Sequence, residues 1–369
     1  MASFNVMALD RNFNLVALLR YTNLQWSRKY HESGTFSIQI PIEQYQPSFK
    51  YIYTNARPET GRITQVNYVH NNKQVFIQLS GYFLEHELNR MVVFAKGEGN
   101  ITGDPVWVES MGTAEDVAYS FFNGFSRVQF NDGTNTINYE LGIGSGINQH
   151  RGLASRHVRD NSYLGNKVYH ILKPSGMSYR VMYNFEENKK YFEVWSGLDR
   201  TSEQTENNPV VFSTKYGNIK NPNVLLDDST YKSGCIVVSS KNDNEGENSS
   251  TYVRALLDLD EFQEDNAFLF LQSLTDVNDF GSLDDYYQAL DSEGRSEKNS
   301  MWTRTMNVEF NTLIGSYEYM VDFDIGDICS IEINEVGISA NARLVGCYEV
   351  IKSNGWSLTL EFGTPIIKR

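Results

Sequence analysis

Apolar and polar residues alternate along much of the first hundred residues, and this two-residue period is the pattern of strands that bury one face. Leu24, Trp26 and Tyr30 share one face of a first segment, whose opposite face is polar. A short loop containing Gly34 follows, and the segment 36–40 then alternates in the same way. Two alternating segments on either side of a short glycine-containing loop predict a β-hairpin.

A hairpin pattern that runs from Gly61 to Gly81 has a counterpart near the C-terminus, from Ala342 to Gly363. In both segments an arginine is the second residue, and an alternating strand ends at a glycine. The span from that arginine to the last glycine is 19 positions in the first segment and 20 in the second, so we expect one extra loop residue in the second. The match predicts two related β-barrels in one chain.

The middle of the chain has a different pattern. Thr113 is a favoured helix N-cap residue, and Val117, Phe121 and Phe122 follow it at helical spacing. The patterns predict helices opening at Thr113 and over 164–172 and 282–293, strands over 178–183, 190–195 and 210–213, and exposed loops over 201–209 and 239–250.

These elements predict a mainly β fold with α+β insertions, in which two related β-barrel domains flank central α+β domains. The 22 Tyr and 21 Phe support this class, because aromatic side chains pack well on a pleated surface. We expect a first barrel over 1–95, an α+β insertion over 96–228, strands of the second barrel over 229–262, a helical insertion over 263–302, and the rest of the second barrel over 303–369.

The charge balance narrows the possible functions. Lysine and arginine number 32 against 46 aspartate and glutamate, which gives a formal net charge of −14. Phosphate binding requires concentrated basic side chains, and no run of five basic residues occurs, so we do not expect tight nucleic-acid binding. An acidic surface keeps a protein soluble, and it would also let DNA pass without adhering.

The cysteines and termini indicate a protein made and folded in a cytoplasm. Cys235, Cys329 and Cys347 are too few and too scattered for a disulfide framework or a zinc site. The N-terminus lacks the basic and apolar parts of a signal peptide, and no apolar run approaches the 18 residues of a membrane span. We therefore expect no membrane insertion.

Acidic clusters are the only candidates for hydrolytic catalysis. Each one lies beside turn or helix-start signals, where carboxylates favour the positive end of a helix for ordinary dipole reasons. We therefore expect no catalytic residue among the candidates, which are Asp227 with Asp228, Asp258 with Asp260 and Glu261, and Asp284 with Asp285.

Metal and cofactor sites are not expected either. The histidines show no pair at metal-ligand spacing; they are His31, His70, His86, His150, His157 and His170. The glycine-rich run from Gly142 to Gly146 lacks the Lys-Ser/Thr of a phosphate loop and the preceding strand of a dinucleotide fold. We expect this run to be a flexible loop.

Four segments, which span 26–36, 61–82, 195–219 and 322–328, resemble in this order the baseplate hub or tail-associated protein family of long-tailed bacteriophages, which is similar to the central hub ring protein of contractile phages. The resemblance covers nearly the whole chain, and its most specific part is the Gly-x-Asp-Arg-Thr at 197–201 followed by Val-Val-Phe-Ser at 210–213. The residues that match the family motifs, with an implied structural role, are Trp26, Arg28, Gly34, Gly61, Gly81, Gly197, Asp199, Arg200, Phe212, Asp324, Gly326 and Asp327.

The resemblance implies a structural subunit rather than an enzyme. Such hubs are homotrimers in which two barrels per chain make six quasi-equivalent barrels, so that a trimer joins a sixfold tail tube and surrounds the channel for DNA and the tape-measure protein. Many relatives continue into hydrolase or fibre modules, whereas this chain stops at residues 365–369. We therefore expect another subunit to degrade the cell wall.

The implied partners are other copies of the chain, the distal tail or tail tube protein, the tape-measure protein and the tail fibres or receptor-binding proteins. DNA is expected only in transit, and the implied location is the tail tip of a virion made in a bacterial cytoplasm. Two alternatives stay open. The many tyrosines and tryptophans would suit a receptor- or carbohydrate-binding tail module, and the acidic clusters would suit a cell-wall hydrolase.

Overall fold

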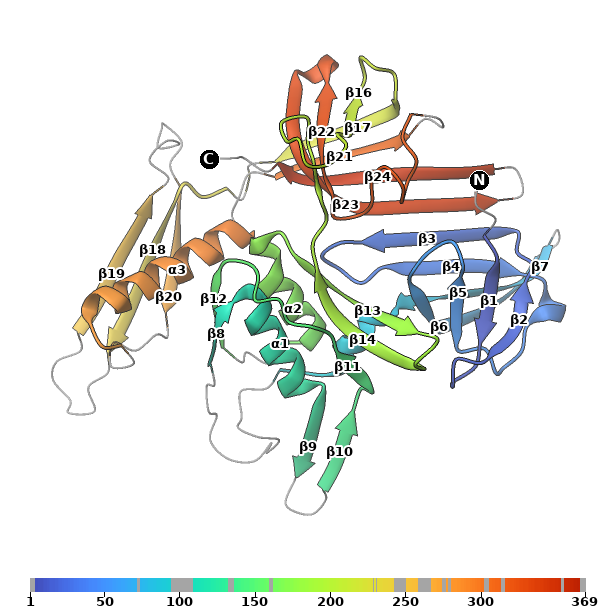
Figure 1. Ribbon diagram of the computed structural model, residues 1–369, viewed down its shortest axis with the longest axis horizontal. Helices are drawn as coiled ribbons and strands as arrows, with labels where there is room; N and C mark the ends of the chain where they lie inside the picture. The colour runs from blue at the N-terminus through green and yellow to red at the C-terminus, as the bar shows by residue number, and fades with distance from the viewer. Residues whose placement is uncertain are drawn as a thin grey trace.

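The computed structural model of the chain is mainly β, as the sequence predicts, with its described α-helices gathered in two insertions (Figure 1). The structure describes residues 4–71, 74–93, 109–131, 136–158, 162–227, 229, 231–241, 250–257, 267–273, 277, 280–301, 305–312, 316–352 and 355–365. Within these ranges no helix combines the length and apolar character needed to cross a membrane.

One large sheet collects described strands from both ends of the chain. Its path is β17-β21-β24-β23-β3-β4-β7-β6-β5-β1-β2, and β15 and β16 join it through β22. In Figure 1 the red C-terminal strands lie directly above the blue N-terminal strands. The strands are β1 (Val6–Leu9), β2 (Leu15–Leu19), β3 (Asn23–Lys29), β4 (Thr35–Ile40), β5 (Tyr51–Thr54), β6 (Thr60–Asn71), β7 (Gln74–Phe83), β15 (Asp199–Arg200), β16 (Val211–Ser213), β17 (Ile219–Asp227), β21 (Thr305–Thr312), β22 (Ile328–Ile333), β23 (Ile338–Lys352) and β24 (Gly355–Pro365).

The sheet contains the same five-strand unit twice. The order of strands is β3-β4-β7-β6-β5 in the first unit, which we call the N-module, and β17-β21-β24-β23-β22 in the second, the C-module. The chain visits the five positions in the same sequence in both modules, and each neighbouring pair is antiparallel. The internal repeat inferred from two hairpins therefore extends to whole modules.

A β-bulge fixes the alignment of the two modules. The pairing of β6 with β7 skips Thr64, and the pairing of β23 with β24 skips Val345, which the sequence matches with Thr64. The residue before the bulge lies opposite Gly81 in the N-module and opposite Phe362 in the C-module. Phe362, rather than Gly363, is thus the counterpart of Gly81, and the extra loop residue expected from the sequence is wrong.

The corrected alignment also matches the burial of the two modules. It places Leu79 with Leu360 and Ile77 with Leu358, and all four side chains are buried. Side chains alternate between the two faces of a strand, so a shift of one residue pairs buried positions of one module with outward positions of the other.

The two predicted β-barrels are corrected to one open sheet that curves around two cores. Residues 346–352 of β23 pair with β3 and carry the sheet from the C-module into the N-module. The strand edges used in this pairing are therefore not available to close either module on itself. One core gathers Val6, Trp26 and Ile38, and the other gathers Phe212, Phe310 and Phe362.

The first insertion, between β7 and β15, carries two helices and several short sheets. It begins with the 3-10 helix η2 (Leu84–Arg90). The predicted helices are confirmed, and Thr113 with Asp116 forms a capping box at the start of α1. The elements are β8 (Glu109–Thr113), α1 (Ala114–Phe125), β9 (Arg127–Asn131), β10 (Thr136–Glu140), β11 (Ile143–Ser145), β12 (Ala154–Val158), α2 (Leu164–Leu172), β13 (Ser178–Asn184) and β14 (Lys189–Trp195).

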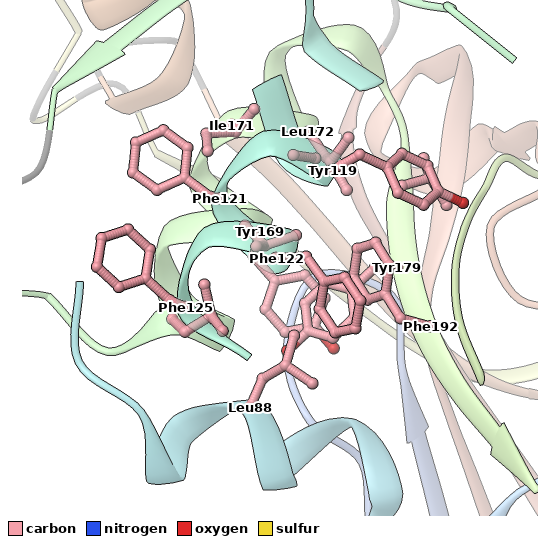
Figure 2. Close-up of a cluster of buried hydrophobic side chains, with 14 of the residues drawn as sticks. Leu88, Tyr119, Phe121, Phe122, Phe125, Tyr169, Ile171, Leu172, Tyr179 and Phe192 are labelled. Atoms are coloured by element: carbon pink, nitrogen blue, oxygen red, sulfur yellow. The ribbon is translucent and has the colours of Figure 1, made fainter. Parts of the chain in front are cut away.

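An aromatic cluster holds the helices of this insertion on the sheet β11-β14-β13 (Figure 2). Phe122 of α1 stacks on Phe192 of β14 with ring centroids 4.2 Å apart and planes within 7°. Tyr169 of α2 packs against Tyr179 of β13 with centroids 4.2 Å apart. Offset and tilted aromatic pairs of this kind stabilise a core beyond the effect of their buried area.

The second insertion, between β17 and β21, is a small sheet covered by one helix. Its elements are β18 (Gly234–Lys241), β19 (Ser250–Leu257), β20 (Phe268–Ser273) and α3 (Leu283–Met301). Their sheet order is β19-β18-β20.

This arrangement differs from two sequence expectations. β18 and β19, expected in the second barrel, pair with β20 instead, while β15 to β17, expected in the first insertion, join the main sheet. The helix also runs beyond the predicted end at Glu293, because Gly294 lies buried inside α3 rather than terminating it.

Candidate functional site

The joint between the modules is the place where the motif around Trp26 meets the motif that contains Asp324. We define the module joint as the pairing of β3 with β23 together with the side chains packed on it. The backbone register runs from Lys29 opposite Gly346 to Asn23 opposite Lys352. On the core side, Trp26 lies opposite Glu349.

Arg28 is the centre of a buried ionic network at the module joint. Its Nε donates to Glu59 Oε1 at 2.6 Å, and its Nη1 contacts Asp324 Oδ1 at 2.5 Å and the hydroxyl of Tyr319 at 2.6 Å. Burial alone would lower the pKa of the guanidinium, but Glu59, Tyr319 and Asp324 raise it well above its ordinary value. The network connects the motif around Trp26 with the motif that contains Asp324.

A second buried ion pair lies beside it. Arg57 Nε donates to Glu349 Oε2 at 2.5 Å, and a second bond joins Arg57 Nη2 to Glu349 Oε1. Trp356 Nε1 also donates to Glu349 at 3.0 Å, and the Glu349 side chain is fully buried. Two parallel bonds of this type fix the relative position of the two groups, so this pair ties the loop after β5 to β23.

The third and fourth motifs meet at Asp327. Its carboxylate accepts from the backbone N–H of Leu198 and from Arg200 Nε, each at 2.7 Å. A Cβ added to Gly197 would lie 2.1 Å from the backbone carbon of Gly326, so the two backbone segments touch without room for a side chain. Asp199 turns this segment by accepting from the backbone of Thr201 at 3.0 Å.

The remaining motif residues are packing positions. A Cβ on Gly34 or Gly61 would lie 2.5 Å from the ring of Phe83 or 2.4 Å from the ring of Phe36, respectively. A Cβ on Gly81 would lie 1.9 Å from the backbone oxygen of a neighbouring strand. Phe212 is buried in the C-module core. These residues act by close approach, and the geometry gives them no chemical role.

Sequence reasoning missed Arg57, Glu59 and Glu349, although one signal was present. Arg28 and Glu349 both occupy inward positions of strands whose other inward residues are mostly apolar. A charged residue at such a position needs a buried partner. That signal shows that a partner exists, but the partner comes from a segment distant in sequence.

Two of the three acidic candidates that the structure describes have structural partners, and the third, Asp284, is exposed. Asp227 Oδ1 accepts from the backbone N–H of Ser229 at 2.9 Å, which is a turn contact. Ser282 and Asp285 exchange hydrogen bonds of 2.8 and 3.2 Å at the start of α3. Asp228, Asp258, Asp260 and Glu261 lie outside the described residues.

The histidine, cysteine and glycine-rich candidates form no metal-binding cluster in the described part of the chain. No group of three or more His, Cys, Asp or Glu side chains there could hold a metal ion. The glycine-rich run at 142–146 is not simply a loop, because Ile143–Ser145 forms β11 and pairs in parallel with β14. All three cysteines are buried and free.

Glu85 of η2 is a buried carboxyl group between the N-module and the first insertion. Its Oε1 accepts from the backbone N–H of Gly34 at 3.0 Å, and its backbone oxygen accepts from the hydroxyl of Tyr179 at 3.2 Å. Burial raises the pKa of Glu85 from 4.5 to about 8. Between about pH 4.5 and pH 8, the Glu85 carboxyl group therefore keeps its proton in the folded protein and loses it in the unfolded chain.

Glu85→Gln is expected to stabilise the protein more at pH 8 than at pH 5. The pKa of Glu85 is higher in the folded protein than in the unfolded chain. Its contribution to the free energy of unfolding is therefore fully present below about pH 4.5 and is lost as the pH rises to about 8. Glutamine, like the protonated acid, does not ionise, and the difference at pH 8 should be on the order of a few kcal/mol. Urea unfolding at the two pH values measures it.

The exposed carboxylate Glu32 supplies the control. Glu32→Gln should shift the unfolding free energy by the same small amount at both pH values. An equal effect of Glu85→Gln at pH 5 and pH 8 would contradict the prediction.

The fold of the chain is similar to that of solved phage tail proteins. The tail protein of Neisseria meningitidis MC58 is 11% identical, with 98% of this chain and 96% of that chain covered at a TM-score of 0.56. The 43 kDa tail protein of prophage MuSo2 from Shewanella oneidensis is 10% identical, with 98% of each chain covered at a TM-score of 0.57. Prophage tail protein gp18 from Listeria monocytogenes is 10% identical, with 97% and 94% covered at a TM-score of 0.51.

The fold is therefore that of a phage tail protein. The chain belongs to the Siphovirus ReqiPepy6 Gp37-like protein family, which it matches over residues 5–364. The resemblance to phage tail proteins that the sequence suggests is confirmed at this level. No curated protein sequence matches the chain.

Proposed function

We propose that this chain is a structural subunit of a phage tail hub, in which three copies form a ring around a channel. The observation that carries the proposal is the five-strand unit that occurs twice in one chain with the same strand order. A closed ring of three such chains presents six similar modules, because closed oligomers repeat one chain around an axis. A threefold assembly of this kind can dock on a tail tube with sixfold symmetry.

The face of the sheet turned away from the two cores is suited to line the channel. Along β3, β4 and β7 this face carries mainly neutral polar side chains, because the apolar residues of the same strands point into the core. The neutral residues are Gln25, Ser27, Thr35, Ser37, Gln39, Gln78 and Ser80. Along these three strands Lys29 is the only basic side chain on this face, and few basic side chains are available to bind phosphates, so DNA would pass without adhering.

This polar face refines the idea that net negative charge alone prevents DNA from binding. Lys29 and Glu361 also lie on the polar face and form an ion pair of 2.9 Å. Local charges on the face are thus partly balanced, and hydroxyl and amide groups supply most of its character.

The partners that follow are the tail tube or distal tail protein on one side of the ring, and the tape-measure protein with fibres or receptor-binding proteins on the other. DNA passes through the channel in transit. The place of the protein is the virion tail tip. Its role is structural, since the motif residues serve as ion pairs and packing contacts.

Mass measurement of the purified protein tests the proposal. Three chains of 42.2 kDa should give a complex of about 127 kDa by native mass spectrometry. Averaged electron micrographs of this complex should show a ring with an open or closed centre and six outer lobes. A monomer at micromolar concentration, or a dimer, would overturn the proposed ring.

A further inference from the structure

Each chain has two strand edges that correspond to the two edges joined at the module joint. In the corrected alignment β6 is the counterpart of β23, and β17 is the counterpart of β3. Among the described residues, segment 65–71 of β6 pairs with β7 alone, and β17 pairs with β21 alone. The two edges lie at opposite ends of the sequence of strands β17-β21-β24-β23-β3-β4-β7-β6.

These edges carry exposed apolar side chains. Val66 and Tyr68 of β6 are 48% and 53% exposed, and Leu225 and Leu226 of β17 are 59% and 64% exposed. Val66 and Tyr68 lie opposite Leu79 and Ile77, which point into the core of the N-module. Their side of the strand therefore faces the core, but no neighbouring strand covers it.

The counterparts of these side chains at the module joint are buried. Cys347 and Glu349 take the places of Val66 and Tyr68, and both are at most 1% exposed. Arg28 takes the place of Leu226 and is 4% exposed. The same positions are therefore covered where two modules meet inside the chain and open where no second module is present.

We infer that β6 of one copy of the chain pairs with β17 of a second copy, antiparallel and in the register of the module joint. In that register Val66 lies opposite Leu226 of the second copy, and Tyr68 lies opposite its Val224. The inference rests on the proposed ring and adds the contact that closes it. Each chain supplies one edge of each kind, so three copies use all six edges.

The side chains suit a contact between chains. Pairing of the two edges covers the apolar side chains of Val66, Tyr68, Val224 and Leu226, and burial of apolar surface favours association. Exposed apolar edge strands otherwise invite unspecific aggregation, so a defined partner also protects the soluble subunit. The module joint inside the chain uses buried ion pairs at these positions, whereas the joint between chains is apolar.

Disulfide trapping tests the register. Residues that lie opposite each other in an antiparallel pair have Cα atoms about 4.5 to 5.5 Å apart, within the range that a disulfide spans. Val66→Cys with Leu226→Cys, treated with oxidised glutathione, should give covalent dimers and trimers on a denaturing gel. The matched control, Val66→Cys with Leu225→Cys, puts the two thiols on opposite faces and should give at least tenfold less product.

The native thiols do not interfere, since Cys235, Cys329 and Cys347 are all buried. All substituted positions in this experiment are exposed or at the open edge, so folding is kept, which a thermal melt verifies. Tyr68→Cys with Val224→Cys gives an independent pair on the same face. The register is wrong if the protein is a trimer by mass and neither in-register pair cross-links above the control.

A charge substitution tests whether the β17 edge lies in the contact between chains, separately from whether a ring forms. Leu226→Asp should raise the concentration at which the trimer dissociates at least tenfold, while Val253→Asp, on the equally exposed β19, should leave it unchanged. A wild-type protein that is monomeric defeats the proposed function and the inference together. A trimer that Leu226→Asp and Val253→Asp weaken equally defeats the inference alone.

Discussion

Gly197→Ala is expected to destabilise the protein by about 3 kcal/mol or more, the upper part of the range for overpacking. The added Cβ would lie 2.1 Å from the carbonyl carbon of Gly326, 2.2 Å from its oxygen and 2.4 Å from the nitrogen of Asp327. Neither segment can withdraw easily. The N–H of Gly326 donates to the backbone oxygen of Leu344 at 2.8 Å, and the Asp327 carboxylate accepts from the N–H of Leu198 at 2.7 Å.

Urea unfolding and the yield of soluble protein measure this effect. Gly124→Ala is the matched control, because nothing lies within 4 Å of a Cβ built there and the residue is in α1. The control should be neutral or slightly stabilising, since alanine favours a helix over glycine. If Gly197→Ala were as stable as the control, the contact between the third and fourth motifs would have no structural role.

Arg57→Ala is expected to cost about 3 to 5 kcal/mol, because it leaves the buried carboxylate of Glu349 without its charged partner. Glu349 would keep only the bond from Trp356. The exposed pair of Arg127 and Glu140, with 69% and 55% exposed side chains, supplies the control. Arg127→Ala should cost at most about 1 kcal/mol, as exposed ion pairs contribute little.

A double substitution distinguishes a buried ion pair from simple packing at the same place. Arg57→Met with Glu349→Leu removes both charges and keeps most of the volume, so it should recover much of the stability that Arg57→Ala loses. Guanidinium chloride unfolding of the single and double variants gives the comparison. A double variant that is less stable than Arg57→Ala would show that shape, rather than charge pairing, holds this part of the module joint.

The sequence predicted the strands and the repeat because their signals are local. The two-residue alternation around Trp26 and the cap at Thr113 are set by neighbours in the chain, and both elements formed where the pattern placed them. The register of the repeat was missed by one residue, because the sequence comparison matched Gly81 with Gly363, whereas the strand pairing across the two equivalent bulges matches Gly81 with Phe362. A bulge depends on the partner strand, which the sequence does not name.

The assignment of strands to sheets failed for the same reason. The segments that form β18 and β19 have ordinary strand patterns, yet they pair with β20 rather than with the main sheet. For the module joint, the sequence pointed to Arg28 and Asp324 as motif residues but not to their contact. These two residues are 296 positions apart, and only the fold brings them together.

The connection between the modules also bears on how a ring would be built. β3 and β23 belong to one polypeptide, so the module joint forms as the chain folds. Two segments linked in one chain meet at an effective concentration that the linker sets, whatever the concentration of the protein in solution. In a ring of three chains, three of the six contacts between modules would lie inside the chains and would already exist before the subunits meet. A dilute subunit would thus need only three intermolecular contacts to complete a circle of six modules.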